Sequence, residues 1–462
     1  MIVMKFGGSS VADGDRIKNV AGIIQSEKRP RVVVVSAMGG VTDSLIGITE
    51  SMKDLSGDIL DLKVKEYGEW LTKKHTEALS TAIDDQQIAE ETFVAVNGLI
   101  EELRKVLLDI GHSEQLSPKS MDYVLSFGER LCINVVSGTL RAIGIGSKPM
   151  TGFEAGLITD SSYGRARPIF RELRKRVARC LRPMVEEGVT PVVSGFIAAN
   201  ELGDMTTLGR GGSDYTASLL GAALGAEEIQ IWTDVDGIMT TDPRIVKEAK
   251  LIDRLSYVEA LDLSYFGAKV IHSKMIEPAM LHDIPVRVKN TFNRNNEGTL
   301  IVRKQEQTDR VIKAIALVRD VMIVTLFGVA MAETPNVAGR VFSVLGEANI
   351  NVIMISGSSE SNLSFVVSSK DADKAIELLA HKVRSDIVEG LSLIHDVAII
   401  CVVNAGMAGT KGVAAKIFSA IYEADVNIMM IAQGSSEVNI AFIVHASDAE
   451  KVVGVLHKKF IE

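Results

Sequence analysis

Two short segments rich in glycine and serine are the first candidates for chemistry. Residues 5–10 read Lys-Phe-Gly-Gly-Ser-Ser, and residues 36–42 read Ser-Ala-Met-Gly-Gly-Val-Thr. Small residues let backbone N–H groups approach phosphate oxygens, and the positive end of a following helix favours an anion. Lys5 adds a full positive charge to the first segment. This pattern indicates a phosphate-binding loop, although a Gly-Gly pair after a strand also forms simple tight turns.

A third segment, residues 206–214, combines groups that suit a carboxylate ligand. It reads Thr-Thr-Leu-Gly-Arg-Gly-Gly-Ser-Asp. Arg210 offers a planar fork of donors that matches a carboxylate, and the flanking glycines leave backbone donors accessible. Asp214 stands where a helical stretch begins, so it either takes part in a reaction or caps the helix. Glu129, within Phe-Gly-Glu-Arg, is an acid that could hold a substrate ammonium group or form an ordinary salt bridge.

Three later segments carry polar groups that suit a nucleotide. Residues 232–237 read Trp-Thr-Asp-Val-Asp-Gly, residues 241–244 read Thr-Asp-Pro-Arg, and residues 266–270 read Phe-Gly-Ala-Lys-Val. A Pro-Arg turn or a helical lysine is ordinary surface in most proteins. Together with the glycine-rich segments, however, they indicate a ligand site rather than punctuation between elements.

The elements that must position these loops alternate between strands and helices. Strand-like runs occur at residues 2–6, 31–36, 190–196, 228–233 and 285–289, separated by helix-length segments. Hydrophobic residues make up 47% of the chain and aromatic residues only 5%, as is typical of buried parallel strands. Loops at the carboxyl ends of such strands face one crevice. The sequence therefore predicts an α/β catalytic domain over residues 1–305, with a helical insertion at about residues 44–116.

Charge and cysteine content exclude several classes of protein. The net charge of -9 gives no general attraction to nucleic acid or to an anionic membrane, so neither is expected as a partner. The three cysteines are far apart and form no Cys-x-x-Cys pair, which argues against disulfides and structural zinc. The N-terminus has no basic leader and no long apolar stretch. We expect a cytoplasmic protein without a protein-bound structural metal.

An internal repeat occupies the C-terminal part of the chain. Residues 349–355 match residues 425–431, and residues 358–362 match residues 435–439, with one residue inserted near Gln433. Each copy is typical of a strand-helix-strand-strand-helix unit, which needs one more strand to complete a ferredoxin-like βαββαβ sheet. The first copy, residues 321–395, can use residues 391–394 for this strand. The second copy, residues 396–462, ends one strand short, so we predict that residues 311–318 cross over to complete it.

Taken in order, these segments resemble the aspartate kinases of the amino-acid kinase family, and the repeated module resembles the ACT domain. The resemblance covers essentially the whole chain and is most specific at the first glycine loop, at Arg-Gly-Gly-Ser-Asp, at Thr-Asp…Asp-Pro-Arg and at Phe-Gly-Ala-Lys. It implies a three-layer αβα kinase domain with a mainly parallel sheet, followed by two ferredoxin-like ACT domains.

The resemblance also implies roles for individual residues. Lys5 and Asp214 form the catalytic pair. Aspartate is expected to contact Ser36, Thr42, Glu129, Phe196, Arg210 and Ser213. ATP is expected to contact Gly7, Gly8, Ser9, Thr233, Asp234, Arg244 and Lys269. An amino-acid effector is expected at the ACT domains, near Asn351, Val352, Asn427, Ile428 and Gln433.

The activity implied is ATP-dependent phosphorylation of the side-chain carboxylate of L-aspartate to 4-phospho-L-aspartate, with Mg²⁺ as cofactor. This reaction opens the pathway to lysine, threonine, methionine and isoleucine, and we expect one of these products to inhibit it. Threonine is preferred over lysine as effector, because Gln433 matches a glutamine of threonine-sensitive relatives and neither Asn351 nor Ile353 is an acid. A homodimer or larger homo-oligomer is expected by analogy, since ACT domains commonly pair across chains.

Two other functions remain open from the residues alone. The first is a kinase of the same fold that acts on glutamate or a nucleoside monophosphate, which Arg210 and Glu129 together disfavour. The second is a catalytically inactive amino-acid sensor, which the presence of Lys5, Arg210, Asp214 and Lys269 disfavours. The polar residues assigned to the effector site could also serve only to cap strands.

Overall fold

The computed structural model describes residues 1–52, 55–113, 116–267, 271–304, 311–331, 336–359, 361–383 and 388–462. The chain divides into two compact units, each described here by itself. Unit 1 comprises Met1–Ile238, Asp253–Tyr257 and Val270–Arg303, and unit 2 comprises Met239–Ile252, Val258–Lys269 and Lys304–Glu462. Among the described residues, no helix is long and apolar enough to cross a membrane.

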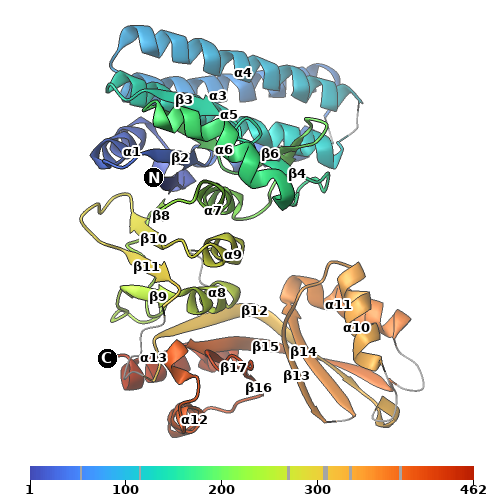
Figure 1. The fold of residues 1–462 in the computed structure, drawn as a ribbon. Coiled ribbons are helices and arrows are strands. Elements are labelled where there is room, and N and C mark those ends of the chain that lie inside the picture. Colours follow the sequence, from blue (N-terminus) through green and yellow to red (C-terminus); the bar gives the residue numbers. More distant parts are fainter. Residues whose placement is uncertain are drawn as a thin grey trace. The chain divides into compact units, whose positions relative to one another are not determined.

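Unit 1 is built on an eight-stranded sheet in the order β3-β5-β2-β1-β8-β10-β11-β9 (Figure 1). All neighbouring strands are parallel except β10 and β11. Runs of valine and isoleucine explain the central strands, because both faces of a parallel sheet are buried. The predicted α/β fold class is thus confirmed. The strands are β1 (Ile2–Phe6), β2 (Arg31–Val35), β3 (Ser147–Met150), β5 (Thr190–Ser194), β8 (Glu228–Thr233), β9 (Arg254–Ser256), β10 (Val286–Asn290) and β11 (Thr299–Val302).

Helices cover both faces of this sheet. One face packs against α1 (Gly14–Ser26), α2 (Val41–Ser51), α3 (Gly57–Ala82), α4 (Gln86–Ser113) and α5 (Pro118–Ala142), which share one apolar core with β1 and β2. The other face contacts α6 (Phe170–Glu186) and α7 (Gly212–Leu224), and α9 (Ser273–Leu281) packs on α7. Helices α2 to α4 occupy the region predicted as a helical insertion, and the layers form the expected αβα arrangement.

A small second sheet and a short helical turn complete the loops of unit 1. Strands β4 (Ile158–Thr159), β6 (Ile197–Asn200) and β7 (Met205–Thr207) form this sheet, in which β6 and β7 are an antiparallel hairpin. The hairpin leads through residues 208–211 into α7. The 3₁₀ helix η1 (Gly8–Val11) follows β1. Both connections carry glycine-rich segments that the sequence singled out.

Unit 2 contains a six-stranded antiparallel sheet in the order β13-β14-β12-β15-β17-β16 (Figure 1). Its strands are β12 (Ala314–Phe327), β13 (Val352–Ser359), β14 (Asn362–Ser368), β15 (Gly390–Val403), β16 (Met430–Ala432) and β17 (Asn439–His445). Its helices include α10 (Val337–Glu347), α11 (Ser369–Lys382), α12 (Val413–Glu423) and α13 (Ala449–Phe460). Separate apolar cores lie in the two repeats.

The long strands β12 and β15 belong to both repeats. Residues 321–327 of β12 pair with residues 390–397 of β15 in the first repeat, and residues 314–318 pair with residues 399–403 in the second. The register shifts between these halves, where Asp320 and Asp396 adopt left-handed φ angles of 56° and 54°. The strand upstream of the first repeat therefore supplies the last strand of the second, as strand counting predicts.

Two segments from the middle of the chain also pack in unit 2. Ile245 and Val246 join the apolar core of the second repeat, because burial there removes their side chains from water. Helix α8 (Tyr257–Tyr265) carries Glu259, whose buried carboxylate lies 3.2 Å from Lys313 Nζ. The predicted catalytic domain, residues 1–305, thus includes segments that lie in the second compact unit.

Candidate active site

A cavity of about 440 Å³ opens in unit 1 at the carboxyl ends of β1 and β2. The first turns of α2 and α7, the turn between β5 and β6, and one buried position of α5 also contribute to it. This is the edge of a parallel sheet where ligands bind in open α/β folds. Its lining consists of Lys5, Gly8, Ser9, Ser36, Ala37, Met38, Gly39, Gly40, Thr42, Asp43, Glu129, Phe196, Gly209, Arg210, Gly211, Gly212, Ser213 and Asp214.

Lys5 and Asp214 form an ion pair in this cavity. Successive side chains of a strand point to opposite faces, so Phe6 enters the core on one face while Lys5 faces α7. Asp214 lies in the first turn of α7, and its Oδ1 is 2.5 Å from Lys5 Nζ. Both side chains are largely buried, with exposures of 10% and 16%. The pair therefore fixes a lysine ammonium at the centre of the site, where a phosphate group is expected.

Glu129 is a buried carboxylate in the lining of the same cavity. Its Oε2 accepts a hydrogen bond from Phe196 N at 2.6 Å, and its Oε1 accepts one from Ser213 Oγ at 3.0 Å. Ser36 Oγ in turn donates to Ser213 Oγ at 3.0 Å. Burial raises the pKa of Glu129 to about 7, although these hydrogen bonds and the charge of Lys5 act in the opposite direction. A cation bound beside this carboxyl would therefore stabilise its ionised form.

The loop before α7 presents Arg210 to the cavity. Gly209 and Gly211 on either side adopt left-handed φ angles of 75° and 74°, which favour glycine. A Cβ on Gly211 would also lie 2.6 Å from the His272 ring. Arg210 is exposed and forms no ion pair with another described residue. Its fork of donors is therefore available to an anionic ligand.

Ten of the predicted catalytic, substrate and ATP residues line this one cavity. They are Lys5, Gly8, Ser9, Ser36, Thr42, Glu129, Phe196, Arg210, Ser213 and Asp214. Gly7 is close by, since a Cβ at this position would lie 3.6 Å from Lys5 Nζ. Sequence reasoning missed Asp43, which follows Thr42 in the first turn of α2 and also lines the cavity. Extending the second glycine segment by one residue would have included it.

Three further predicted ATP residues, Thr233, Asp234 and Arg244, do not line the cavity. Thr233 Oγ1 donates to the neighbouring Asp234 at 3.1 Å. Arg244 is exposed, pairs with Asp242 at 2.6 Å and belongs to unit 2. Lys269 lies outside the described residues. The nucleotide roles of these four residues stay predictions.

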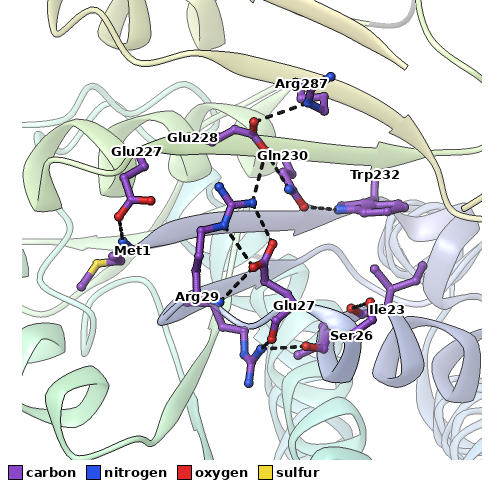
Figure 2. A network of polar contacts seen from close by, with 12 residues as sticks. Met1, Ile23, Ser26, Glu27, Arg29, Glu227, Glu228, Gln230, Trp232 and Arg287 are labelled. Atoms are coloured by element: carbon purple, nitrogen blue, oxygen red, sulfur yellow. Dashed lines mark hydrogen bonds and ion pairs between the residues drawn. The ribbon is translucent and has the colours of Figure 1, made fainter. Parts of the chain in front are cut away.

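A polar network along β8 holds the strand that flanks the first glycine loop (Figure 2). Glu228, Gln230 and Trp232 point to one face of β8, and hydrogen bonds link Gln230 to both neighbours at 2.7 and 3.0 Å. Arg29 and Arg287 approach the Glu228 carboxylate at 3.7 and 3.4 Å. At the other end, Trp232 O accepts from Gly7 N at 3.1 Å. The network therefore fixes the start of the loop that begins beside Lys5.

The predicted effector residues lie at equivalent places in the two repeats of unit 2. Asn351 and Asn427 each follow a residue pair that includes a left-handed position, Asn349 or Asp425. Both asparagines are exposed, while Val352 and Ile428 are half-buried. Gln433 is exposed directly after β16. Strands β13 and β16, which stand at the two ends of the sheet order, lie close together.

Comparison with known proteins gives a consistent relationship over the full chain. Residues 1–290 match the amino acid kinase family, and residues 324–383 and 400–460 match an ACT domain. The chain is 34% identical over 471 residues to aspartokinase 1, chloroplastic, of Arabidopsis thaliana, covering 100% of this chain and 80% of that relative. It also matches bifunctional aspartokinase/homoserine dehydrogenases of Arabidopsis thaliana, of which it spans 51% and 50%.

Solved structures show the same relationship. Escherichia coli aspartokinase III in complex with aspartate and ADP aligns with a TM-score of 0.83 and 31% identity, covering 100% of both chains. The same enzyme in complex with lysine and aspartate aligns with a TM-score of 0.81 and 30% identity, again over 100% of both chains. These matches show that the chain belongs to the amino acid kinase family and, within it, to the aspartokinases.

Proposed function

We propose that this protein transfers the γ-phosphoryl group of ATP to the side-chain carboxylate of L-aspartate, forming 4-phospho-L-aspartate and ADP. The observation that carries the proposal is one cavity in which Lys5, Glu129, Arg210 and Asp214 converge. Similarity to an aspartokinase crystallised with aspartate and ADP supports the choice of both substrates.

The cavity offers complementary partners for each charged group of an α-amino acid. Arg210 has a free fork of donors for a carboxylate, and the buried Glu129 gains a cationic partner if it faces an ammonium group. A nucleoside monophosphate has no ammonium group to place beside Glu129. Glutamate carries the same charges and differs by one methylene, so shape rather than charge must separate it from aspartate.

The acceptor needs no general base, because the side chain of aspartate is already ionised at neutral pH. A carboxylate oxygen forms a bond to the γ-phosphorus as the bond from that phosphorus to the β–γ bridging oxygen breaks. Negative charge moves onto ADP, and no proton is transferred. Catalysis therefore depends on positioning the two anions and on neutralising their charge.

The chain supplies much of this neutralisation itself. Lys5 Nζ lies beside Gly7, and Gly8 and Ser9 begin the 3₁₀ helix η1 at the edge of the cavity. Backbone donors there and the Lys5 ammonium suit a phosphate. Asp214 holds Lys5 in place and has no proton to remove from the acceptor. Mg²⁺, which usually binds through substrate phosphates with one or two carboxylates, would supply further positive charge, and Asp43 and Asp214 are the cavity carboxylates that would help to hold it.

We further propose that an end-product amino acid regulates the enzyme through the two ACT repeats. Threonine is favoured by the exposed Gln433 at the turn after β16. Lysine is a second candidate, because E. coli aspartokinase III forms a complex with lysine. Activity titrated against threonine and lysine, separately and together, distinguishes them. Pairing of ACT repeats across chains into a homo-oligomer is part of the same proposal, and light scattering tests it.

A coupled assay of ADP release tests the catalytic proposal. Aspartate, glutamate and a nucleoside monophosphate serve as alternative acceptors, and aspartate should give turnover at least an order of magnitude above the others. Lys5→Ala should reduce turnover by several powers of ten, whereas Lys18→Ala, an exposed lysine paired with Asp84, serves as the matched control. If the native enzyme shows no turnover with any of these acceptors, the result would instead support an amino-acid sensor.

A further inference from the structure

Asp122 is a buried carboxylate that lies outside the cavity lining. It sits on α5 about two helical turns before Glu129, and its exposure is 1%. Burial raises the pKa of Asp122, and hydrogen bonds from Gly164 and Thr207 oppose that effect. Burying a carboxylate costs free energy unless its oxygens accept hydrogen bonds. The hydrogen-bond partners of Asp122 therefore indicate its role.

The partners of Asp122 come from two separate segments. Gly164 N donates to Oδ1 and Oδ2 at 3.0 and 2.9 Å. Thr207 N donates to Oδ2 at 2.9 Å, and Thr207 Oγ1 donates to Oδ1 at 2.8 Å. Asp122 thus joins the loop around Gly164 to the last residue of β7.

Both segments contact the start of the loop that carries Arg210, residues 208–211, which we call the Arg210 loop. Thr207 O accepts from Ala166 N at 2.8 Å, and the next residue, Leu208, donates its N–H to Phe196 O at 3.0 Å. Gly164 O and the Arg165 side chain pack against Gly209, since a Cβ there would lie 3.2 Å from Gly164 O and 3.7 Å from Arg165 Cγ. Arg210 follows at once, and no ion pair with a described residue orients its side chain. The position of its Cα, and with it the region that its fork can reach, is therefore set by the backbone of residues 207–209.

We propose that Asp122 is a positioning residue that sets the affinity for aspartate through the Arg210 loop, without contacting the substrate. The inference rests on the proposed role of Arg210 as the carboxylate ligand. Asp122 acts through the geometry of its hydrogen bonds and not through its charge. A misplacement of about 1 Å can cost on the order of 100-fold in rate, so loss of the Asp122 hydrogen bonds should have a measurable kinetic consequence.

Steady-state kinetics of three variants test the positioning role of Asp122. Asp122→Ala leaves Gly164 N and Thr207 N without their acceptor, and the KM for aspartate should rise about 10- to 100-fold while the KM for ATP changes little. Asp122→Asn should lie closer to the native value than Asp122→Ala. Its amide oxygen, in the place of Oδ2, can accept from Gly164 N and Thr207 N, and its amide N–H can donate to Thr207 Oγ1, although that amide nitrogen then stands 3.0 Å from Gly164 N. Thr207→Val removes one bond and should give an intermediate KM for aspartate.

Controls distinguish positioning from loss of structure and from failure of the proposed site. Val135→Ala makes a cavity elsewhere on α5 and should leave the KM for aspartate unchanged. If Arg210→Ala raises the KM for aspartate but both Asp122→Ala and Thr207→Val leave it within about twofold, the positioning role is wrong. If Asp122→Ala fails to fold, Thr207→Val decides alone. If Asp122→Asn is as impaired as Asp122→Ala, charge matters and the geometric role is refuted. If Arg210→Ala has no effect, the proposed substrate site itself fails.

Discussion

Replacing Glu129 by glutamine should make the protein more stable at neutral and alkaline pH while it weakens aspartate binding. The pKa of Glu129 is raised to about 7 in the folded protein, chiefly by burial, against a usual value of 4.5. The folded state therefore holds this proton more tightly than the unfolded state. Stability from the protonated acid is present below pH 4.5 and is lost as pH rises through 7. Glutamine keeps the shape and can accept from Phe196 N and donate to Ser213 Oγ.

The size of the change in stability follows from the rise in the pKa of Glu129. A displacement of about 2.5 pKa units corresponds to about 3 kcal/mol at pH 8 and above, as an order-of-magnitude value. At pH 4 or below Glu129 is largely protonated in both the folded and the unfolded protein, so its ionisation no longer lowers the stability. Glu129→Gln should therefore gain stability progressively between pH 4.5 and 7. The carboxylate that binds an ammonium group is only about 10% ionised at pH 6, so the native KM for aspartate should rise about tenfold from pH 8 to pH 6.

Two measurements check this reasoning. Urea unfolding of the native protein and of Glu129→Gln across pH 4 to 9 gives the difference in unfolding free energy, which should grow with pH. The KM for aspartate over pH 6 to 8 should vary in the native enzyme, and in the variant it should be high and independent of pH. A difference in stability that stays constant across this range would refute the assigned protonation state of Glu129.

Three further predictions concern His75, Lys313 and Gly211. His75 is fully buried on α3, and burial lowers its pKa to about 4. The unfolding free energy should therefore fall by about 2–3 kcal/mol as pH drops from above 6.5 to 4.5. Urea unfolding of His75→Leu should not show this loss. Lys313→Met removes one cation, whose Nζ lies 3.2 Å from the buried Glu259 carboxylate, and should lower the unfolding free energy by up to about 3–5 kcal/mol. Glu259→Gln should partly restore stability in the double variant, and equal stability of the native protein and the single variant contradicts this. Gly211→Ala places a Cβ against His272 at a φ of 74° and should raise the KM for aspartate while ATP binding is kept, as steady-state kinetics would show.

Local patterns in the sequence were sufficient to predict much of the fold. Runs such as Arg31–Val35 and Glu228–Thr233 are strands because valine and isoleucine suit buried parallel sheets. Counting strands in the two repeats led to the assignment of residues 311–318, and the structure pairs residues 314–318 with β15. These features depend on periodicity and on strand number, which a sequence displays directly.

The candidate site was predictable where its residues lie in recognisable segments. Lys5, Arg210 and Asp214 stand in glycine-rich motifs at strand ends, and the structure places all three on one cavity. Their chemical roles come from the resemblance and remain proposals. Asp43 was missed only because the motif was ended one residue early.

Long-range polar contacts could not be predicted. Asp122 reads as an ordinary helical acid, and only the folded chain brings Gly164 and Thr207 to it. Likewise, Lys313 and Glu259 are unremarkable in sequence, yet their burial together ties α8 to the second repeat within unit 2. No local pattern encodes such pairings, because they depend on which surfaces of distant segments meet.

Trapping the acyl phosphate tests the central claim most directly. The native enzyme is incubated with ATP, Mg²⁺, aspartate and hydroxylamine, and the hydroxamate product is identified by mass. Phosphorylation of the side-chain carboxylate predicts aspartate 4-hydroxamate in amounts equal to the ADP released, and none from Lys5→Ala. ADP release without hydroxamate, or hydroxamate formed equally well by Lys5→Ala, would contradict the account.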